Sequence, residues 1–169
     1  MTPISYEYVY LIALGANLGD RESFLLRARQ SLSDRAGSIL ANAGIYVTAP
    51  VGAADQQFLN SALLLGSGQT PEKLLHTLLA IETSLGRVRE VHWGNRTIDL
   101  DIIMAKKGDH YLSVAAPALL VPHPRLLERN FVLCPCVEIA PDWVHPDTKK
   151  SLAAECSSRN FSLQPSFRI

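Results

Sequence analysis

The segment Ile98-Asp-Leu-Asp-Ile-Ile-Met104 decides the fold, because apolar and acidic side chains alternate along it. Successive side chains of a β-strand point to opposite faces, which places the even-numbered apolar residues, from Ile98 to Met104, on one face. Asp99 and Asp101 are expected on the other face. The segment therefore predicts a strand with one buried face and one face that carries two carboxylates.

Patterns before this segment predict the elements that pair with it and pack on it. Residues 8–14 form an apolar run that ends in a glycine-containing loop, which is typical of a buried strand. Residues 21–34 show apolar positions at helical spacing after Asp20, which is a suitable helix cap. The remaining predicted elements are strands at 39–47 and 58–65 and a helix at 71–85.

The resulting order, β-α-β-β-α-β, predicts an α+β fold of the ferredoxin-like kind, an antiparallel sheet with both helices on one face. The opposite face is then free to hold ligands. The loop at 48–57 is longer than a tight hairpin requires and is a candidate for function. A C-terminal helical extension is expected at 125–139 and 151–156. We expect one domain over 1–169, with a loosely ordered tail at 158–169.

The composition excludes several classes of protein. The 169 residues are 47% apolar and carry 16 basic and 16 acidic side chains, so a broad surface for nucleic acid is not expected. No basic and apolar leader and no apolar run of membrane-spanning length is present, so we expect a cytoplasmic protein that binds no membrane. Cys134, Cys136 and Cys156 lack a two-residue metal spacing; they are interpreted as buried reduced thiols, with a metal or redox site as the alternative.

Asp99 and Asp101 carry the first chemical hypothesis. Carboxylates at i and i+2 of a strand lie on one face, about 7 Å apart, and can share a pair of divalent cations. Hard oxygen ligands suit Mg²⁺, which leaves its other positions to phosphate oxygens and water. Taken alone, Asp-x-Asp is weak evidence for a metal site, and a solvated polar face on a half-exposed strand is the more usual interpretation.

The stretch before the two aspartates is rich in cationic and aromatic side chains. Cations that converge with metal-binding carboxylates are suited to a polyphosphate, whose charge is then balanced from both sides. The alternative is a surface loop of ion pairs. The residues of this stretch are Arg87, Arg89, His92, Trp93 and Arg96.

Other candidates have two interpretations each. His123, between two prolines, is either a phosphate donor or a turn residue, and Arg129 favours the first. Asn60 offers an amide edge to a heterocycle or to local backbone. Phe58 and Phe131 are core residues by default. The loop at 15–19 has neither the P-loop nor the dinucleotide glycine pattern, so any ATP site has another architecture.

Taken together, these motifs resemble the 6-hydroxymethyl-7,8-dihydropterin pyrophosphokinase family of the folate pathway. The resemblance runs from Leu14-Gly-Ala-Asn-Leu18 through Phe58-Leu-Asn60 and Gly86-Arg-Val-Arg89 to Val121-Pro-His123. The segment Arg96-Thr-Ile-Asp-Leu-Asp-Ile102 is highly specific for that family.

The resemblance implies direct transfer of the β,γ-diphosphate of ATP to the pterin hydroxymethyl oxygen, with release of AMP. It implies that Asp99 and Asp101 hold two Mg²⁺ ions and that Arg87 and Arg96 neutralise the moving diphosphate. The further ATP contacts that it implies are Glu82, Arg89, His92, Trp93, Ile102, His123 and Arg129. The pterin contacts that it implies are Thr48, Pro50, Val51, Phe58, Asn60, Trp93 and Phe131.

Some positions depart from the family pattern, and they gather on the nucleotide side. They predict weaker or differently arranged ATP contacts, and they are Leu79, His92, Ala118, Leu120 and Pro124. A monomer with ATP and the pterin as small-molecule partners is expected. The competing interpretations are a non-catalytic pterin-binding relative, a ferredoxin-like RNA-binding module and a two-metal phosphodiesterase that needs no pterin.

Overall fold

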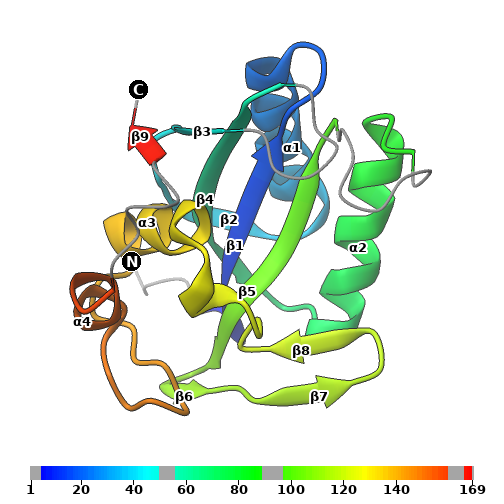
Figure 1. The fold of residues 1–169 in the computed structure, drawn as a ribbon. Coiled ribbons are helices and arrows are strands. Elements are labelled where there is room, and N and C mark those ends of the chain that lie inside the picture. The colour runs from blue at the N-terminus through cyan, green and yellow to red at the C-terminus, as the bar shows by residue number, and fades with distance from the viewer. Residues whose placement is uncertain (1–4, 50–55, 89–96, 160–165, 169) are drawn as a thin grey trace.

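The computed structural model describes residues 5–49, 56–88, 97–159 and 166–168 (Figure 1). In chain order the elements are β1 (Tyr8–Ala16), α1 (Arg21–Arg35), β2 (Ser38–Asn42), β3 (Tyr46–Thr48), β4 (Phe58–Ser67), α2 (Pro71–Ser84), β5 (Asp99–Lys107), β6 (His110–Tyr111), β7 (Val114–Ala116), β8 (Leu119–Val121), the 3-10 helix η1 (Leu126–Glu128), α3 (Asn130–Ile139), α4 (Leu152–Ser157) and β9 (Ser166–Arg168).

The main sheet is antiparallel and has the order β6-β5-β1-β4-β3-β9, with β2 pairing to β4 beside β3. The single strand predicted at 39–47 is thus two strands along one edge of β4. Its ladder is interrupted between them, where Ala43 still donates its N–H to the Ala62 carbonyl. The central order is that of a ferredoxin-like βαββαβ unit, which confirms the predicted α+β fold.

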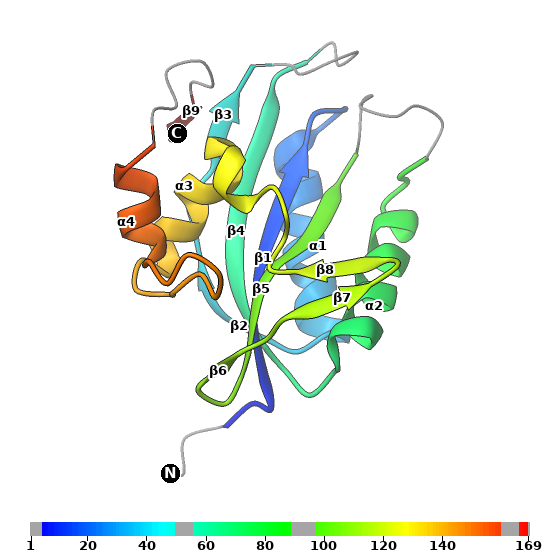
Figure 2. The ribbon, with the colours of Figure 1, turned by 60° about the horizontal axis from the view of Figure 1, so that its bottom comes forward.

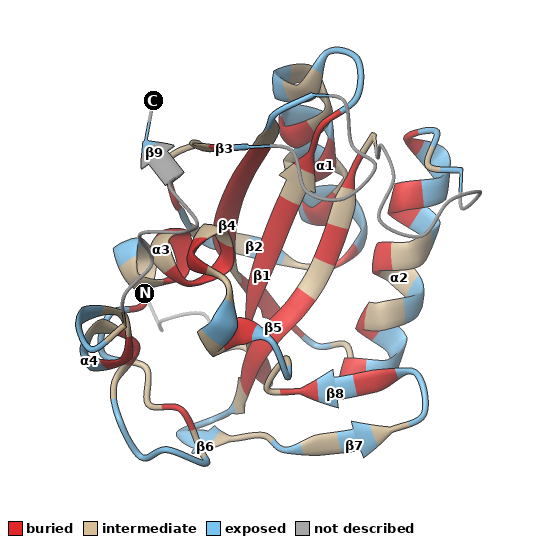
Figure 3. Cartoon of the chain, viewed as in Figure 1, coloured by how far each residue is buried: buried red, intermediate tan, exposed pale blue. Residues whose placement is uncertain are grey.

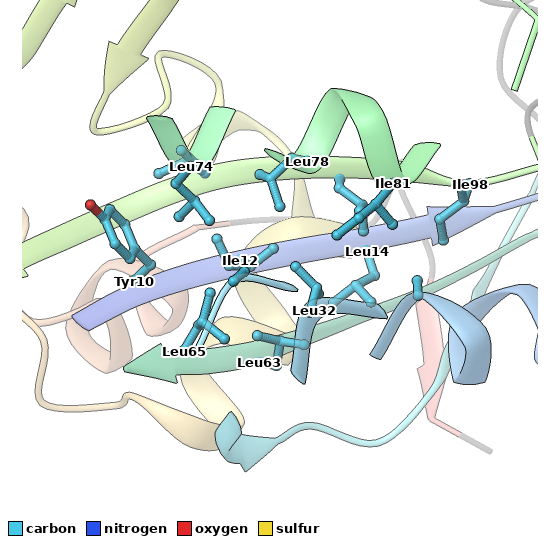
Figure 4. Packing of buried hydrophobic residues seen from close by; sticks show 14 of the residues in the cluster. Tyr10, Ile12, Leu14, Leu32, Leu63, Leu65, Leu74, Leu78, Ile81 and Ile98 are labelled. Atoms are coloured by element: carbon cyan, nitrogen blue, oxygen red, sulfur yellow. The ribbon is translucent and has the colours of Figure 1, made fainter. Parts of the chain in front are cut away.

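Helices α1 and α2 cover one face of this sheet, as predicted. Their apolar stripes meet the even-numbered side chains of β1 and the matching side chains of β4 in a dry cluster (Figure 4). Asp20 caps α1 by accepting a bond from the Ser23 N–H, and Thr70 caps α2 in the same way before Pro71. Full burial of such leucine and isoleucine side chains contributes roughly 1.5–3 kcal/mol each.

The opposite face is not left open over its whole length, which corrects the expectation from sequence. Helix α3 packs Val132, Leu133 and Cys136 against Leu11 and Ile103 in a second apolar cluster. Figure 2 shows α3 and α4 on the side of the sheet away from α1 and α2. The central strands are therefore buried on both faces over much of their length (Figure 3). Within the described residues, Asp99, Asp101 and Asn60 at the end of this face near the start of β5 lie outside that apolar cluster.

Strand β5 contains an irregularity that the alternation did not predict. The register with β1 shifts between Leu11 and Ile12, so that Met104 and Ile102 pair with these two neighbours and Ile103 is an extra residue. A β-bulge of this kind reverses the facing of the residues beyond it. Met104 consequently packs with α3, whereas Ile102 stays on the face of α1 and α2.

The C-terminal region returns to the sheet. The predicted helical region at 125–139 is broken at Arg129, whose extended backbone separates η1 from α3. Within the tail expected at 158–169, Arg159 bonds Glu155 of α4, and β9 pairs with β3. Residues 166–168 of the expected tail thus form a strand at the edge of the main sheet.

Two further expectations concern cysteines and membranes. All three cysteines are free thiols, as predicted, but only Cys136 is fully buried; Cys134 and Cys156 are half-buried. Among the helices in residues 5–49, 56–88, 97–159 and 166–168, none is long and apolar enough to cross a lipid bilayer.

Candidate active site

The two aspartates lie on the face of the sheet opposite α1 and α2. Asp99 of β5 pairs with Gly15 of β1, and Gly15 pairs on its other side with Asn60 of β4. Paired residues of an antiparallel ladder share a face, so these three side-chain positions form one row. Asp101 begins the next row, beside Ala13.

Gly15 carries no side chain, so nothing projects from the middle of this row. A Cβ built at that position would come within 3.3 Å of the Asn60 side-chain oxygen. The absent side chain therefore leaves room between the Asp99 carboxylate and the Asn60 amide. A glycine inside a strand often marks such a close approach, and this is the signal in the sequence that our prediction of site residues missed.

Arg87 binds Asp99 and is itself held by Glu82 of α2. Its Nη1 lies 2.6 Å from Asp99 Oδ1 and also contacts Glu82 Oε1. Gly86 adopts a left-handed φ of 86°, which ends α2 as predicted and turns the chain so that the Arg87 N–H reaches the Glu82 carbonyl. The carboxylate of Glu82 is buried and accepts the Leu100 N–H at 2.7 Å, so the end of α2 and the start of β5 are joined through one side chain.

The pKa values of these groups show an excess of negative charge. Burial raises the pKa of Asp101 to about 7, and the carboxylates of Asp99 and Glu82 add to this shift. Burial also raises the pKa of Glu82, against the opposing effects of the Leu100 N–H and Arg87. For Arg87, burial alone would lower the pKa, but Asp99 and Glu82 outweigh it and raise it. Among the described residues, Arg87 thus bonds both Asp99 and Glu82, and burial makes Asp101 costly to ionise.

His123 lies next to β5 and is held as a neutral donor. Its backbone N–H donates to the Ile103 carbonyl at 2.8 Å, and its ring Nδ1 accepts the backbone N–H of Arg125 at 3.1 Å. Burial lowers the pKa of His123, with the Arg129 charge as the next cause. A neutral ring that accepts at Nδ1 carries its proton on Nε2. His123 can therefore offer one N–H to an anionic ligand.

A neutral group of side chains lies at the other end of the row. Asn60 donates from Nδ2 to Thr48 Oγ1 at 3.0 Å, and both residues are buried. Phe58 pairs with Thr48 on the same face and is half-buried. Phe131, at the start of α3, is also half-buried, and the Arg129 guanidinium lies 5.8 Å from its ring centre. Asn60 and Phe58 thus offer an amide edge and an aromatic ring to a flat heterocycle.

Comparison with known proteins decides the family. The sequence profile of the 7,8-dihydro-6-hydroxymethylpterin-pyrophosphokinase (HPPK) family matches residues 11–141. The chain belongs to the HPPK family. The resemblance inferred from the sequence is thereby confirmed, and with it pyrophosphokinase chemistry that uses ATP and a pterin, a step of folate biosynthesis.

Several HPPK relatives are similar over most of this chain. The 2-amino-4-hydroxy-6-hydroxymethyldihydropteridine pyrophosphokinase of Bacillus subtilis (strain 168) is 45% identical over 130 residues, which are 76% of this chain and 75% of that protein. The enzyme of the same name from Porphyromonas gingivalis is 40% identical over 82% of this chain and 94% of its own length. The folic acid synthesis protein fol1 of Pneumocystis carinii is 40% identical over 89% of this chain, which spans only 20% of fol1.

Solved structures bear on the fold alone, because their sequence identity is low. An HPPK-DHPS crystal structure in complex with substrates has a TM-score of 0.69 at 13% identity, over 90% of this chain and 43% of that chain. The Plasmodium falciparum HPPK-DHPS with pterin and p-hydroxybenzoate has a TM-score of 0.69 at 14% identity. It covers 93% of this chain and 44% of its own. This chain thus spans less than half of these fused HPPK-DHPS chains.

The structure brings together many, though not all, of the residues predicted from the HPPK resemblance. Asp99, Asp101, Asn60, Thr48 and Phe58 share the ligand face. The Ile102 side chain is buried among the apolar residues on the opposite face, so a contact from that side chain to ATP is not supported. Six predicted residues lie outside the described residues: Pro50, Val51, Arg89, His92, Trp93 and Arg96.

The donor set fits magnesium. Asp99 and Asp101 offer hard carboxylate oxygens on one face, and the raised pKa of Asp101 marks charge that a divalent cation would balance. Among the described residues, no group of three or more His, Cys, Asp and Glu side chains has the arrangement of a metal site. Two carboxylates with the remaining positions left to phosphate and water are the usual protein share for Mg²⁺.

Proposed function

We propose that this chain transfers the β,γ-diphosphate of ATP directly to the hydroxymethyl oxygen of 6-hydroxymethyl-7,8-dihydropterin, with two Mg²⁺ ions held by Asp99 and Asp101. The observation that carries the proposal is the row on the ligand face, where Asp99 lies beside Arg87 at one end and Asn60 lies at the other, with Asp101 in the next row. A polyphosphate at the charged end and a pterin at the neutral end would then meet over Gly15.

The charged end would bind and orient the diphosphate. When bound, Mg²⁺ supplies charge neutralisation to the phosphate oxygens and polarises the phosphorus that is attacked. Arg87, held by Glu82, is positioned to offset the negative charge that shifts towards the leaving AMP. Arg96 is proposed for the same task from the segment that follows Arg87. Catalysis of this kind rests mainly on alignment and charge stabilisation.

Buried Glu82 supports Arg87 instead of reaching the nucleotide through its own carboxylate. Its Oε1 is already bonded to the Leu100 N–H and to Arg87. The nucleotide contacts that we propose are therefore the Nε2–H of His123 and the guanidinium of Arg129, with Arg89, His92 and Trp93 as further predictions.

The pterin would lie at the neutral end. Asn60, fixed by Thr48, presents its amide to the edge of the ring, while Phe58 and Phe131 are proposed to stack on its faces. Stacking supplies affinity, and a buried hydrogen-bonding edge rejects analogues that lack it. Pro50, Val51 and Trp93 remain predictions for the same subsite.

The residues that depart from the family pattern are still expected to weaken or rearrange the contacts to ATP. Ala118 and Leu120 are exposed at the β7–β8 hairpin, Leu79 is half-buried on α2, and Pro124 is exposed after His123. We expect ATP to bind more weakly than in relatives with polar groups at these positions, and a titration that gives equal affinity would contradict this. We further propose that the chain works as one domain and as a monomer in the cytoplasm.

The test of the function is a product assay. The protein is incubated with ATP, Mg²⁺ and 6-hydroxymethyl-7,8-dihydropterin, and the nucleotide products are separated by ion-exchange chromatography. AMP formed only in the presence of the pterin supports diphosphate transfer. ADP as the product, or AMP at the same rate without pterin, would refute it.

A further inference from the structure

The C-terminal strand β9 lies outside the family match, which ends at residue 141, and joins the sheet next to the neutral end of the site. It pairs with β3 in antiparallel register, Arg168 with Tyr46 and Ser166 with Thr48. Figure 1 shows β9 beside β3, at the edge of the sheet. A segment beyond the family match thus contacts a strand that carries a residue of the proposed pterin subsite.

Side chains fasten β9 to the rest of the molecule. Glu138 of α3 accepts the Gly44 N–H and the Arg168 guanidinium, both at 3.1 Å, on Oε1, and the Tyr46 hydroxyl at 2.8 Å on Oε2. A Cβ at Gly44 would come within 2.5 Å of Arg168 Nε, so the guanidinium lies directly against the Gly44 backbone. We call Gly44, Tyr46, Glu138 and Arg168 the Glu138 clamp.

The hydrogen bonds and charges of the clamp keep Glu138 ionised and Tyr46 protonated at neutral pH. Burial would raise the pKa of Glu138, but the bonds from Tyr46 and Gly44 and the charge of Arg168 outweigh it and lower the pKa. Burial and the bond to Glu138 raise the pKa of Tyr46 to about 12, so the phenol remains a donor at neutral pH. Hydrogen bonds to a charged acceptor are the stronger kind.

The clamp leads directly to the pterin subsite through β3. This strand has only three residues, and its other edge pairs Tyr46 with Asn60 and Thr48 with Phe58. The Thr48 hydroxyl then fixes the Asn60 amide. A strand this short has few ladder bonds of its own, so its position depends on what holds both of its edges.

We propose that β9 and the Glu138 clamp are positioning elements for the pterin subsite, which hold β3 and thereby keep Thr48 and Asn60 in register. Arg168 acts through β3 and touches no substrate. This inference rests on the proposed function, because it takes the pterin to lie at Thr48 and Asn60.

The test separates pterin binding from ATP binding and from the chemical step. In Arg168→Ala we expect the KM for the pterin to rise about three- to tenfold, because apparent affinity falls with the fraction of molecules in which β3 is correctly held. The KM for ATP and kcat should change less than about twofold, and Arg168→Lys should restore part of the pterin affinity. Backbone amides of β3 should exchange hydrogen for deuterium faster in Arg168→Ala. The matched control is Lys107→Ala, which removes a similarly exposed cation from its ion pair with Glu7 at the far end of β5.

The wild-type result tests the proposed function, and the variant results test the positioning role of β9 and the Glu138 clamp. A wild-type protein that forms no AMP with the pterin refutes the proposed function. An active wild type whose pterin KM and β3 exchange are unchanged by Arg168→Ala refutes the positioning role. An equal rise in both KM values, or the same effect in Lys107→Ala, also refutes it, because the clamp would then act on general stability alone.

Discussion

The two ends of the proposed site are held in opposite ways. At the charged end, Asp99, Asp101 and Glu82 crowd around Arg87, and burial keeps the pKa of Asp101 high. At the neutral end, Asn60 and Thr48 are buried and bonded to each other. The charged end is thus arranged for ligands that bring positive charge, whereas at the neutral end the described polar side chains already bond each other in the free protein.

Their supports also differ. The charged end stands on β5, which is anchored in the sheet by a long ladder with β1 and is joined to α2 through Glu82. At the neutral end Asn60 stands on β4, which also has a long ladder with β1, but its partner Thr48 stands on three-residue β3, held between β4 and β9. Neutralising a carboxylate at the charged end should therefore remove activity while it stabilises the fold. Removing a hydrogen-bond partner at the neutral end should lower both the stability of the fold and the affinity for the pterin.

The largest effect is expected from Asp101→Asn. A bound metal contributes several kcal/mol to the transition state, so kcat should fall by about a hundredfold or more. The raised pKa of Asp101 means that the folded protein favours the protonated acid, so stability is lost as the pH rises from the ordinary aspartate pKa, about 3.9, to the raised value of about 7. In EDTA the variant should therefore melt above wild type at pH 8, and the two should converge only as the pH falls below about 4.

Asp109→Asn, in the exposed turn after β5, is the control for charge removal alone. A melting temperature for Asp101→Asn at or below that of wild type at pH 8 would contradict the picture of an overcharged site.

The next effect concerns the support of Arg87. Glu82→Gln keeps an acceptor for the Leu100 N–H but removes the charge that fixes Arg87. We expect kcat to fall about 10- to 100-fold, the equivalent of about 1.5–3 kcal/mol for a hydrogen bond to a charged group. Steady-state assays with Glu72→Gln, on the exposed first turn of α2, as the control measure this. If only the KM for ATP rises and kcat is unchanged, Glu82 contacts the nucleotide instead.

At the neutral end, Thr48→Val removes the acceptor of the Asn60 amide with little change in shape. A buried donor left without its partner costs about 1–3 kcal/mol, so unfolding by urea should need correspondingly less denaturant. The pterin KM should rise while kcat changes little. Thr83→Val, on the exposed side of α2, is the control. Unchanged stability would show that the bond between Thr48 and Asn60 does not hold the subsite.

The smallest effect is a loss of stability in acid. The pKa of Glu138 is lowered in the folded state, so the clamp stabilises the protein above the ordinary glutamate pKa and is lost as the pH falls through the lowered value. The urea midpoint of wild type should exceed that of Glu138→Gln at pH 6, and the difference should shrink towards pH 3.5. A difference that stays constant over this range would mean that the Glu138 charge contributes nothing.

Local pattern was sufficient to predict much of the fold and the charged end. The alternation around Asp99 and Asp101 predicted their shared face, and the cationic stretch that begins at Arg87 was predicted to converge with them; Arg87 does contact Asp99. The same alternation failed at Met104, because a one-residue bulge is a property of the pairing with β1 and leaves no mark in the period of β5 alone.

Contacts between distant segments were beyond the reach of local pattern. Glu138 lies 94 residues from Gly44 and 30 residues from Arg168 in the sequence. No sequence motif near these residues predicts the clamp. The cover of α3 over the second face also arises from tertiary packing, since its apolar residues fit any buried helix. Gly15 did carry a signal, as a glycine within a strand, but its meaning depends on the register with Asn60.

One measurement tests most directly whether the two ends form a single site. A crystal structure is determined with Mg²⁺, an unreactive ATP analogue and the pterin alcohol bound together. Our account predicts metal density at the carboxylates of Asp99 and Asp101, and the pterin edge against Asn60 with its hydroxymethyl group towards the phosphates. A pterin bound away from Asn60, or metal ions that contact neither aspartate, would contradict it.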